Sequence, residues 1–416
     1  MSYKVSNICR LCLSKKIKTT FTFKPMPIGE KYSRNKFKKK TIKYPFSVGL
    51  CKKCKNVQTM EVVNDKKLWK NYTYFSSQTK AISSHFKEVS KYIIKQIELN
   101  KNHLVIDIGS NDGTLLKNFK NLGIKVLGVD PAENVVRYAN SIGINTIVGK
   151  FDKSIEKKIL KKNPKAKLVT AFNVFAHTSK LREMLKTIDN VLDDTGFFVF
   201  EVQYLGDILD KKILGTFFHE HMHHHSITSL KNFLEEFNFN FFDAMKVNIQ
   251  KGSIIGIATK NQKIRKTKSF KKILKNEIKN KYCTEKKLIE FKNFVQYSKE
   301  KIKKIVNREK NNILCGYGAA RSGPNFLLNY GLDKKIDFLV DDHPMKVNKF
   351  SAFNNLKVYP TKVLNKKKIN LCVIFAYLHQ KKIIKKNLTY LKSGGNFLVL
   401  FPIPKIINKK NYKKFL

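Results

Sequence analysis

Hydrophobic and polar positions change their spacing in a regular way between residues 83 and 130. In SSHFKEVSKYIIKQIE, residues 83–98, apolar side chains recur every three or four positions, which is typical of an amphipathic helix. A continuous apolar run from Leu104 to Ile108 then leads into the turn GSNDG and the segment TLLKNF. This order predicts a buried strand, a tight turn and a helix, and KVLGVD predicts a second strand that ends at Asp130.

Similar patterns continue to the C-terminus. We expect a strand at Gly149–Asp152 and another in LVTAFNVFAH, which ends at Asn173 and His177. A lysine-rich helical stretch is predicted at about residues 264–310. NNILCGYGAARSG then predicts a strand, a glycine turn and a helix, and IDFLVDD and NLCVIFAYL predict two more strands. A chain of 416 residues exceeds what a single core usually covers, so we expect two or three domains.

The formal charge of +52 comes from 83 Lys and Arg against 31 Asp and Glu. Such a charge permits binding of nucleic acid or another polyanion. Lysine is, however, spread through nearly every segment, which favours a solvated surface that attracts small anionic substrates. No apolar run approaches the roughly 20 residues of a membrane helix, and MSYKVSNICRLC lacks the apolar core of a signal peptide. We therefore expect a cytoplasmic protein without a membrane partner.

Four of the seven cysteines form two CxxC pairs, Cys9 with Cys12 and Cys51 with Cys54. Each pair directs two thiolates to one point, and two pairs complete a tetrahedral ligand set. In a cytosolic protein this spacing favours a structural Zn²⁺ over a disulfide, and a redox-active pair is the alternative. Because four thiolates leave no open coordination position, we do not expect this zinc to be catalytic.

The turn after Ile108 carries polar groups in a D-x-G-x-N-D-G pattern, which differs from the G-x-G-x-x-G of dinucleotide-binding proteins. The residues of the pattern are Asp107, Gly109, Asn111, Asp112 and Gly113. Acidic groups would repel a pyrophosphate here, whereas they suit the cationic amino-acid end of S-adenosylmethionine. Asp130 follows at the spacing at which an acid binds both ribose hydroxyls. The pattern resembles motif I of class I methyltransferases, and we assign Pro131, Phe151 and Asn173 to the same cofactor site.

Further motifs follow in a fixed order along almost the whole chain. They are CKKCKNVQ, YTYFSSQTK, VIDIGSNDGTLL, GVDPAENV, NVFAHT, FEVQYLGDIL, TFFHEHMHHHSITSL, KGSIIGIATK, and GYGAARSG followed by DFLVDDHPMKVNKF. In this order they resemble the zinc-containing sugar C-methyltransferases that act on nucleotide-linked 4-keto-deoxysugars. The resemblance implies an α/β fold with a zinc-binding module at 1–75, a class I methyltransferase Rossmann-like core at 76–263 and a C-terminal Rossmann-like domain at 264–416. It also implies S-adenosyl-L-methionine and structural Zn²⁺ as cofactors and a small nucleotide sugar as partner.

Methylation of a carbon beside a ketone requires a base for the α-proton and donors for the enolate oxygen, but no metal. The resemblance places these groups in a Tyr-His-Glu-His segment, which reads FHEH here, residues 218–221. It implies His221 as the base and Glu220, His177 and His219 as further catalytic candidates. Phe218 stands where the family has a tyrosine. Three interpretations are therefore open: another donor replaces the hydroxyl, the substrate differs, or C-methylation has been lost. The candidates for another donor are His219, His223, Tyr204 and a water molecule.

The resemblance also implies a set of substrate-binding residues, namely Tyr72, Tyr74, Ser76, Glu201, Tyr204, Ser253 and Arg321. Arg321 and the neighbouring N–H groups of GYGAARSG could grip a diphosphate. His223, His224 and His225 have three interpretations: a polar helix entry or support for the site residues, a direct catalytic role, or part of a histidine metal site.

Other classes of function stay open beside the sugar methyltransferase. One is a methyltransferase with a different small-molecule substrate, and another is a nucleotide-sugar binder without catalysis. A third is a zinc protein that binds or modifies nucleic acid. The charge permits this third function, but NVFA lacks the N/D-P-P-Y/F of enzymes that methylate base amino groups. The sequence indicates neither the nucleotide, nor the methylated carbon, nor the oligomeric state.

Overall fold

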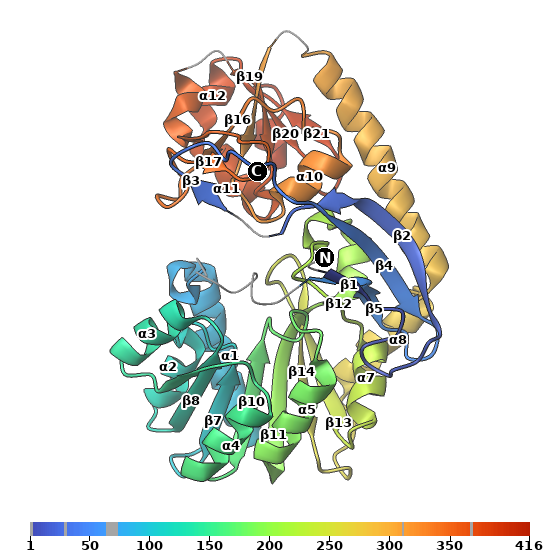
Figure 1. Cartoon of the computed structure of the whole chain (residues 1–416), viewed down its shortest axis with the longest axis vertical. Helices are drawn as coiled ribbons and strands as arrows, with labels where there is room; N and C mark the ends of the chain where they lie inside the picture. The colour runs from blue at the N-terminus through green and yellow to red at the C-terminus, as the bar shows by residue number, and fades with distance from the viewer. Residues whose placement is uncertain (1–2, 29–30, 64–73, 310–311, 367–368) are drawn as a thin grey trace. The chain divides into compact units, whose positions relative to one another are not determined.

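The computed structural model describes residues 3–28, 31–63, 74–309, 312–366 and 369–416. Contacts divide the chain into two compact units (Figure 1). Unit 1 contains Met1–Lys18, Gly49–Gly206 and Met222–Thr284, and unit 2 contains Thr19–Val48, Asp207–His221 and Glu285–Leu416. The predicted segment boundaries at residues 75 and 263 do not coincide with this division, so the three-part organisation stays a prediction. No helix of the described residues is long and apolar enough to cross a membrane.

Unit 1 is built on a seven-stranded sheet with the order β13-β14-β11-β10-β7-β8-β9. The strands are β7 Leu104–Ile108, β8 Lys125–Asp130, β9 Thr146–Val148, β10 Ala166–Phe172, β11 Leu192–Gln203, β13 Asn240–Val247 and β14 Ser253–Thr259. Five strands are parallel, and β14 is antiparallel to both β11 and β13. The chain moves outward from β7 to β9 and then returns to β10, so its direction reverses between β7 and β10. Open α/β sheets bind ligands at the carboxyl ends of the strands at such a point.

Helices cover this sheet, and most of them begin directly after a strand. They are α1 Lys80–Ile97, α2 Thr114–Lys120, α3 Glu133–Ser141, α4 Lys153–Lys162, α5 Leu181–Val191, α7 Ile227–Glu235 and α8 Lys268–Lys279, with a 3₁₀ turn at Ser76–Gln78. The division between the two units falls inside α6, Leu205–Asp210. The helix predicted at 83–98 is confirmed as α1. It buries Phe86, Val89, Ile93 and Ile97 against the core. Each such side chain contributes on the order of 1.5–3 kcal/mol when fully buried.

Two details of the sequence prediction are wrong. No strand forms at Gly149–Asp152, because β9 ends at Val148 and the Asp152 carboxylate caps α4 by accepting hydrogen bonds from the next turn. Strand β10 ends at Phe172, since Asn173 has a φ of 58° and cannot continue an extended strand. The helical stretch predicted at about 264–310 is confirmed, as two helices, α8 and α9, the latter at Glu285–Asn307.

The N-terminal residues form short strands that belong to two smaller sheets. Strand β1, Tyr3–Val5, pairs with β6, Glu61–Val63. A four-stranded sheet has the order β12-β5-β4-β2, formed by β12 His223–His224, β5 Val57–Thr59, β4 Tyr44–Cys51 and β2 Ile17–Met26. The division between the two units falls inside β2 and β4.

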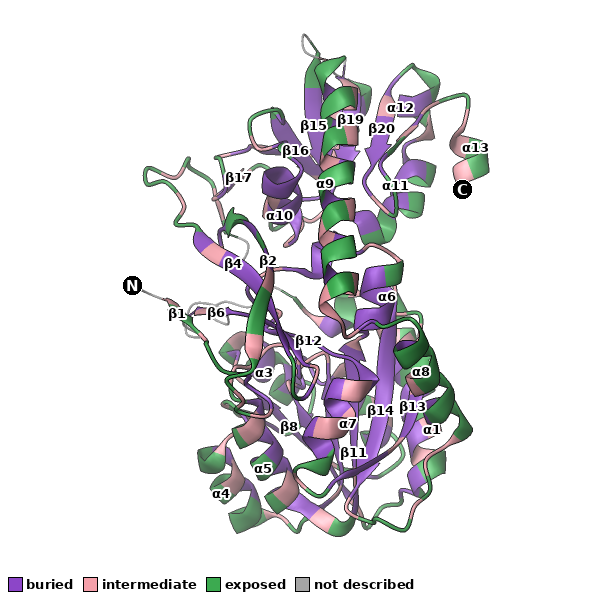
Figure 2. Cartoon of the chain, turned by 90° about the vertical axis from the view of Figure 1, so that its right-hand side faces the viewer, coloured by how far each residue is buried: buried purple, intermediate pink, exposed green. Residues whose placement is uncertain are grey.

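Unit 2 contains a six-stranded sheet with the order β18-β16-β15-β19-β20-β21. Its strands are β15 Ile313–Tyr317, β16 Phe338–Asp341, β18 Val358–Pro360, β19 Ile369–Ile374, β20 Asn396–Val399 and β21 Lys405–Ile407. The three strands predicted from this part of the sequence are confirmed. The other elements are α9, α10 Gly323–Asn329, α11 Gln380–Lys386, α12 Leu388–Lys392, α13 Tyr412–Phe415, short 3₁₀ turns at Leu214–Thr216, Thr361–Asn365 and Tyr377–His379, and the strand pair β3 Tyr32–Ser33 with β17 Phe350–Ser351. Figure 2 shows the exposed face of α9 in green, opposite a buried stripe that includes Leu288, Phe291 and Val295.

Candidate functional site

Cys9, Cys12, Cys51 and Cys54 come together in unit 1 as the sequence predicts, and their sulfur atoms all lie within 4.8 Å of one another. The sulfurs of Cys9 and Cys54 are 3.4 Å apart, and those of Cys12 and Cys51 are 3.6 Å apart. Zinc–sulfur bonds of about 2.3 Å in a tetrahedron correspond to edges of roughly 3.8 Å. The four thiols are free of disulfides and match a zinc ion of this size.

Two identical turns present these thiols. The residue after the second cysteine of each pair is left-handed, Leu13 with a φ of 56° and Lys55 with a φ of 66°. Each of these two residues donates its N–H to the carbonyl of the first cysteine. The sulfurs of Cys9 and Cys54 share a hydrogen bond, which lowers the pKa of Cys9 and raises that of Cys54. A thiolate near neutral pH is the form that binds a metal.

The predicted cofactor turn follows β7 in unit 1 and is held by the acid at the end of β8. The Asp130 carboxylate accepts hydrogen bonds from the N–H of Asn111 at 2.9 Å and of Ala132 at 2.8 Å. Gly109 has a φ of +65°, and a Cβ added there would lie 2.4 Å from a Cγ2 methyl of Val174. Burial raises the pKa of Asp130. The turn is therefore fixed in shape by a glycine and an acid, as a site that receives a ligand at a helix start requires.

Asn111 and Asp112 bind the chain just before α1. The Asn111 side chain accepts from the N–H of Ser76 at 3.0 Å and donates to the carbonyl of Tyr74, also at 3.0 Å. Asp112 accepts from the N–H of Ser77 at 2.8 Å. These two side chains thus join the cofactor turn to the entry of α1.

Asp107 lies inside β7 and is fully buried. Its carboxylate accepts a hydrogen bond of 2.6 Å from the Thr170 hydroxyl on β10. Burial raises the pKa of Asp107 to about 7. Asp107 thus links β7 to β10 directly before the cofactor turn.

A histidine with no predicted role lies on α1, the helix whose entry is joined to the cofactor turn. His85 on α1 is 2.5 Å from the Glu201 carboxylate, measured from Nε2 to Oε2, and Glu201 also accepts from the Asn173 side chain at 2.9 Å. Glu201 is completely buried. The presence of His85 in the predicted helix could have suggested a site residue. Its partner Glu201 lies on β11, far away in sequence, so the pair could not be predicted.

The remaining positions predicted in unit 1 have varied surroundings. Tyr72 lies outside the described residues. Tyr204 is 1% exposed, and its pKa is raised by burial and by the nearby Glu277 carboxylate. The Ser253 hydroxyl is buried and donates to the carbonyl of Ile249 at 3.4 Å. Pro131 is half-buried and Phe151 is buried. Tyr204 and Ser253 are thus held in the protein interior.

The FHEH segment lies in unit 2. His221 Nδ1 is 2.8 Å from the carbonyl oxygen of Thr216, and its ring packs against Phe218 with centroids 4.1 Å apart. His219 Nε2 contacts the carbonyl of Pro45 at 3.0 Å. Glu220 forms an ion pair of 2.5 Å with Arg321, so two predicted site residues that are far apart in sequence meet here.

The glycine turn of unit 2 repeats the hydrogen-bond pattern of the cofactor turn. The Asp341 carboxylate at the end of β16 accepts from the N–H of Ala319 at 2.7 Å and of His343 at 2.8 Å. Gly318, with a φ of +99°, donates to the carbonyl before this acid, as Gly109 does in unit 1. Asp341 lies in the predicted strand IDFLVDD, but the sequence pattern alone did not indicate its role.

The other histidines of the cluster are buried in unit 1. Strand β12 contains His223 and His224, and burial lowers the pKa of His224 to about 3 and that of His225 to about 4. His177 is half-buried in the loop after β10. Within the part of the chain that the structure describes, these histidines form no metal-ligand set like that of the cysteines. The cluster is therefore divided between the two units after His221.

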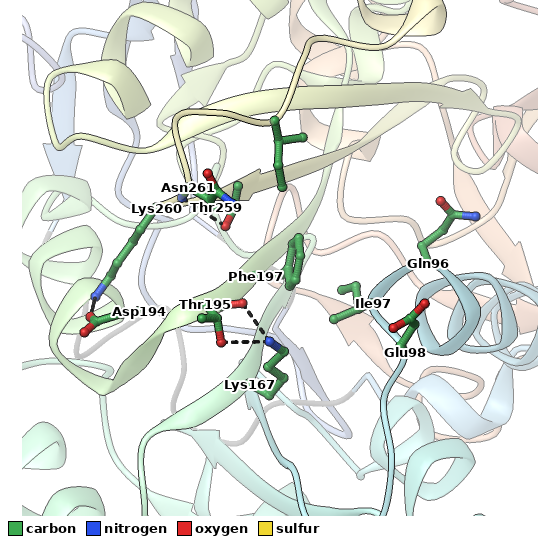
Figure 3. A pocket seen from close by; sticks show the side chains of 11 residues that line it. Gln96, Ile97, Glu98, Lys167, Asp194, Thr195, Phe197, Thr259, Lys260 and Asn261 are labelled. Carbon is green, nitrogen blue, oxygen red and sulfur yellow. Dashed lines mark hydrogen bonds and ion pairs between the residues drawn. The ribbon is translucent and has the colours of Figure 1, made fainter.

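A pocket of about 530 Å³ lies at the opposite edge of the unit 1 sheet, by the amino ends of β10 and β11 (Figure 3). Lys167 and Lys260 line it. Both ammonium groups already donate to the protein, Lys167 to Thr195 at 2.9 Å and Lys260 to Asp189 at 2.8 Å. The pocket shares no lining residue with the predicted cofactor site.

Three family models match the chain. A model described as "Putative zinc binding domain" matches residues 9–69, "Methyltransferase domain" matches 81–243 and "C-methyltransferase C-terminal domain" matches 248–404. Among curated proteins, the C-methyltransferase NovU of Streptomyces niveus is 26% identical over 372 residues, which cover 88% of this chain and 89% of NovU.

Solved structures resemble part of the chain. A SAM-dependent methyltransferase from Archaeoglobus fulgidus is 20% identical with a TM-score of 0.32 and covers 41% of this chain and 93% of its own. Magnesium protoporphyrin IX methyltransferase from Synechocystis PCC 6803 with bound SAH is 16% identical with a TM-score of 0.35, covering 43% of this chain and 83% of its own. Because these scores are low, the identification rests on the family models, the strand order and the cysteine cluster. The chain is an S-adenosylmethionine-dependent C-methyltransferase with a zinc-binding module.

Proposed function

We propose that this enzyme methylates a carbon of a nucleotide-activated keto-deoxysugar through an enolate, with His221 as the base. S-adenosylmethionine supplies an electrophilic methyl group when it is bound. The protein has to remove the α-proton of the sugar and stabilise the charge that develops on the carbonyl oxygen.

The observation that carries the proposal is the hydrogen bond of His221 with Thr216. A backbone carbonyl only accepts, so His221 Nδ1 carries the proton in this contact, at 2.8 Å. The neutral ring then has its lone pair on Nε2, which is the tautomer that a base requires. The stacked Phe218 ring restricts rotation of the imidazole without adding a competing acceptor.

Groups suited to an anionic substrate support the nucleotide sugar as acceptor. Arg321 is 28% exposed beside the buried Glu220, and a guanidinium binds phosphate groups through paired N–H donors. The Asp341-braced turn has the same pattern as the turn that we assign to S-adenosylmethionine. We assign the diphosphate to Arg321 and the neighbouring N–H groups, and leave the choice of nucleotide to experiment.

The test is a panel of 4-keto-deoxyhexoses linked to dTDP, UDP, GDP or CDP, incubated with S-adenosylmethionine. One member should gain a methyl group on carbon, detected by mass spectrometry and NMR. In D₂O with S-adenosylhomocysteine in place of the methyl donor, the enzyme should still exchange the α-proton of that sugar. His221→Ala should lower both exchange and methylation by about 100-fold or more, while affinity for S-adenosylhomocysteine stays unchanged.

His379→Ala is the matched control, because His379 is an exposed histidine of the same unit. Full exchange by the His221→Ala enzyme would exclude His221 as the base and direct attention to His177 or His219. Binding of a nucleotide sugar with neither exchange nor methylation would favour a binding protein in which Phe218 marks the loss of catalysis.

A further inference from the structure

His85, Glu201 and Asn173 form a chain of hydrogen bonds inside unit 1. Glu201 has no exposed surface, and the His85 side chain is 10% exposed. One carboxylate oxygen is 2.5 Å from His85 Nε2, and the other accepts from Asn173 Nδ2 at 2.9 Å. The Asn173 N–H also donates to the Glu201 carbonyl at 2.8 Å. The two carboxylate oxygens and the backbone carbonyl of Glu201 are therefore all hydrogen-bonded, and the carboxylate holds the imidazole of His85 in one orientation.

This chain of hydrogen bonds is attached to the cofactor turn at two points. Asn173 precedes Val174, whose side chain packs directly on Gly109. Helix α1, which carries His85, is entered through Ser76 and Ser77, and both bind the side chains of the turn. Strands β10 and β11 end here at the carboxyl edge of the sheet, beside the reversal point where such folds bind their ligands.

The hydrogen bonds leave one ring nitrogen for another partner. His85 Nε2 faces an acceptor and carries a proton, and no described residue forms a hydrogen bond with Nδ1. A completely buried carboxylate needs a cation or several donors, and an imidazolium meets this need. In that form Nδ1 also carries a proton and is a donor.

We propose that His85, held by Glu201 and Asn173, is a catalytic residue that donates a hydrogen bond from Nδ1 to the carbonyl oxygen of the methyl acceptor. The proposal rests on the proposed function, because it requires an enolate. When the α-proton passes to the base, its C–H electron pair forms the carbon–carbon double bond and a carbonyl pair moves to oxygen. His85 keeps its proton and stabilises this oxygen. The oxygen pair then re-forms the carbonyl and the double-bond pair forms the bond to the methyl group, whose former bonding pair would stay on the sulfur of the donor as S-adenosylhomocysteine.

The test compares Glu201→Gln and His85→Gln with the wild type in the full-length enzyme, using the keto sugar selected from the panel. The Glu201→Gln substitution places an amide opposite His85 with little change of shape, so it removes the charge that stabilises the imidazolium. We expect kcat and the rate of α-proton exchange to fall by about 100-fold or more. The KM of the sugar and the affinity for S-adenosylhomocysteine should stay within about threefold, since the lost contact strengthens only as charge develops.

Glu88→Gln on the exposed face of α1 and His103→Gln in the turn after it are matched controls that should keep wild-type kcat. Wild-type kcat in both Glu201→Gln and His85→Gln would overturn the proposal and leave the pair a structural contact.

A second measurement needs no acceptor. The ¹⁵N-histidine spectrum of the protein with S-adenosylhomocysteine should show His85 protonated on both nitrogens at pH 7, and on one in Glu201→Gln. A neutral His85 in the wild type would overturn the donor role whatever the acceptor is. Inactivity of the wild type toward the whole panel would instead refute the proposed acceptor, and the spectrum would still decide the role of His85.

Discussion

Replacing Cys54 by serine is expected to release the zinc and to loosen the N-terminal part of unit 1. The metal joins two CxxC pairs, and 38 residues lie between Cys12 and Cys51. By the chain-entropy relation for a cross-link, a loop of this length corresponds to about 4 kcal/mol of stabilisation. Cys54 is 4% exposed and contacts Cys9. Water therefore cannot take the place of the thiolate ligand that is lost when Cys54 is replaced by serine.

The measurement has two parts. Elemental analysis should find one zinc per chain in the wild type and less than a tenth of that in Cys54→Ser. Urea unfolding followed at the N-terminal module should show a loss of about 4 kcal/mol in the free energy of unfolding. Binding of S-adenosylhomocysteine should persist, because the cofactor turn is braced by Asp130 and not by the cysteines.

Cys283→Ser is the control, since Cys283 lies outside the cluster in the same unit. It should keep its zinc and its stability at the N-terminal module. The reasoning would be refuted if the wild type contained no zinc, or if Cys54→Ser retained it.

Two further predictions concern the cofactor turn. Gly109→Ala should destabilise unit 1 and abolish binding of S-adenosylhomocysteine in calorimetry, because φ is +65° and the new Cβ would lie 2.4 Å from the Val174 side chain. Gly123→Ala is the control: its φ is +75°, but only the flexible Lys101 side chain lies nearby, so this variant should keep binding. Asp107→Asn should flatten the pH dependence of stability. The native pKa of about 7 exceeds the ordinary 3.8, so wild-type stability falls as pH rises from about 4 to about 7. The variant should gain up to roughly 4 kcal/mol relative to the wild type above pH 7 in urea titrations without ligand, and equal slopes for both proteins would contradict the assignment.

The strands around the cofactor turn could be predicted because their signals are local. Leu104–Ile108 is a continuous apolar run bounded by a glycine turn, and the structure confirms it as β7 without change. The four cysteines were also predictable, since the CxxC spacing itself requires two turns that point thiols at one centre.

Local details were missed where one residue changes the backbone. Asp152 reads as the end of a strand, yet DKSIE also has the acid-first pattern of a helix cap, and the cap is what forms. Lys281, with a φ of 55°, helps to end the long helical pattern between α8 and α9. Both features were weak in the sequence because apolar spacing continues across them.

Contacts between distant segments were beyond sequence reasoning. Glu220 and Arg321 are 101 positions apart, and His85 and Glu201 are 116 apart. Glu220, Arg321 and Glu201 were candidates one by one, but in each pair the fold brings together two side chains that no periodicity relates.

The cofactor turn and the start of α1 are connected so that they move together. The connection consists of the hydrogen bonds of Asn111 and Asp112 with Tyr74, Ser76 and Ser77. A ligand that binds the turn is therefore coupled to the helix that carries His85. By linkage, whatever factor the methyl donor adds to sugar affinity, the sugar must add to donor affinity. The kinetic signature is synergy in an initial-rate study: the apparent KM of each substrate should fall as the other approaches saturation, and disrupting Asp112 should make the two independent.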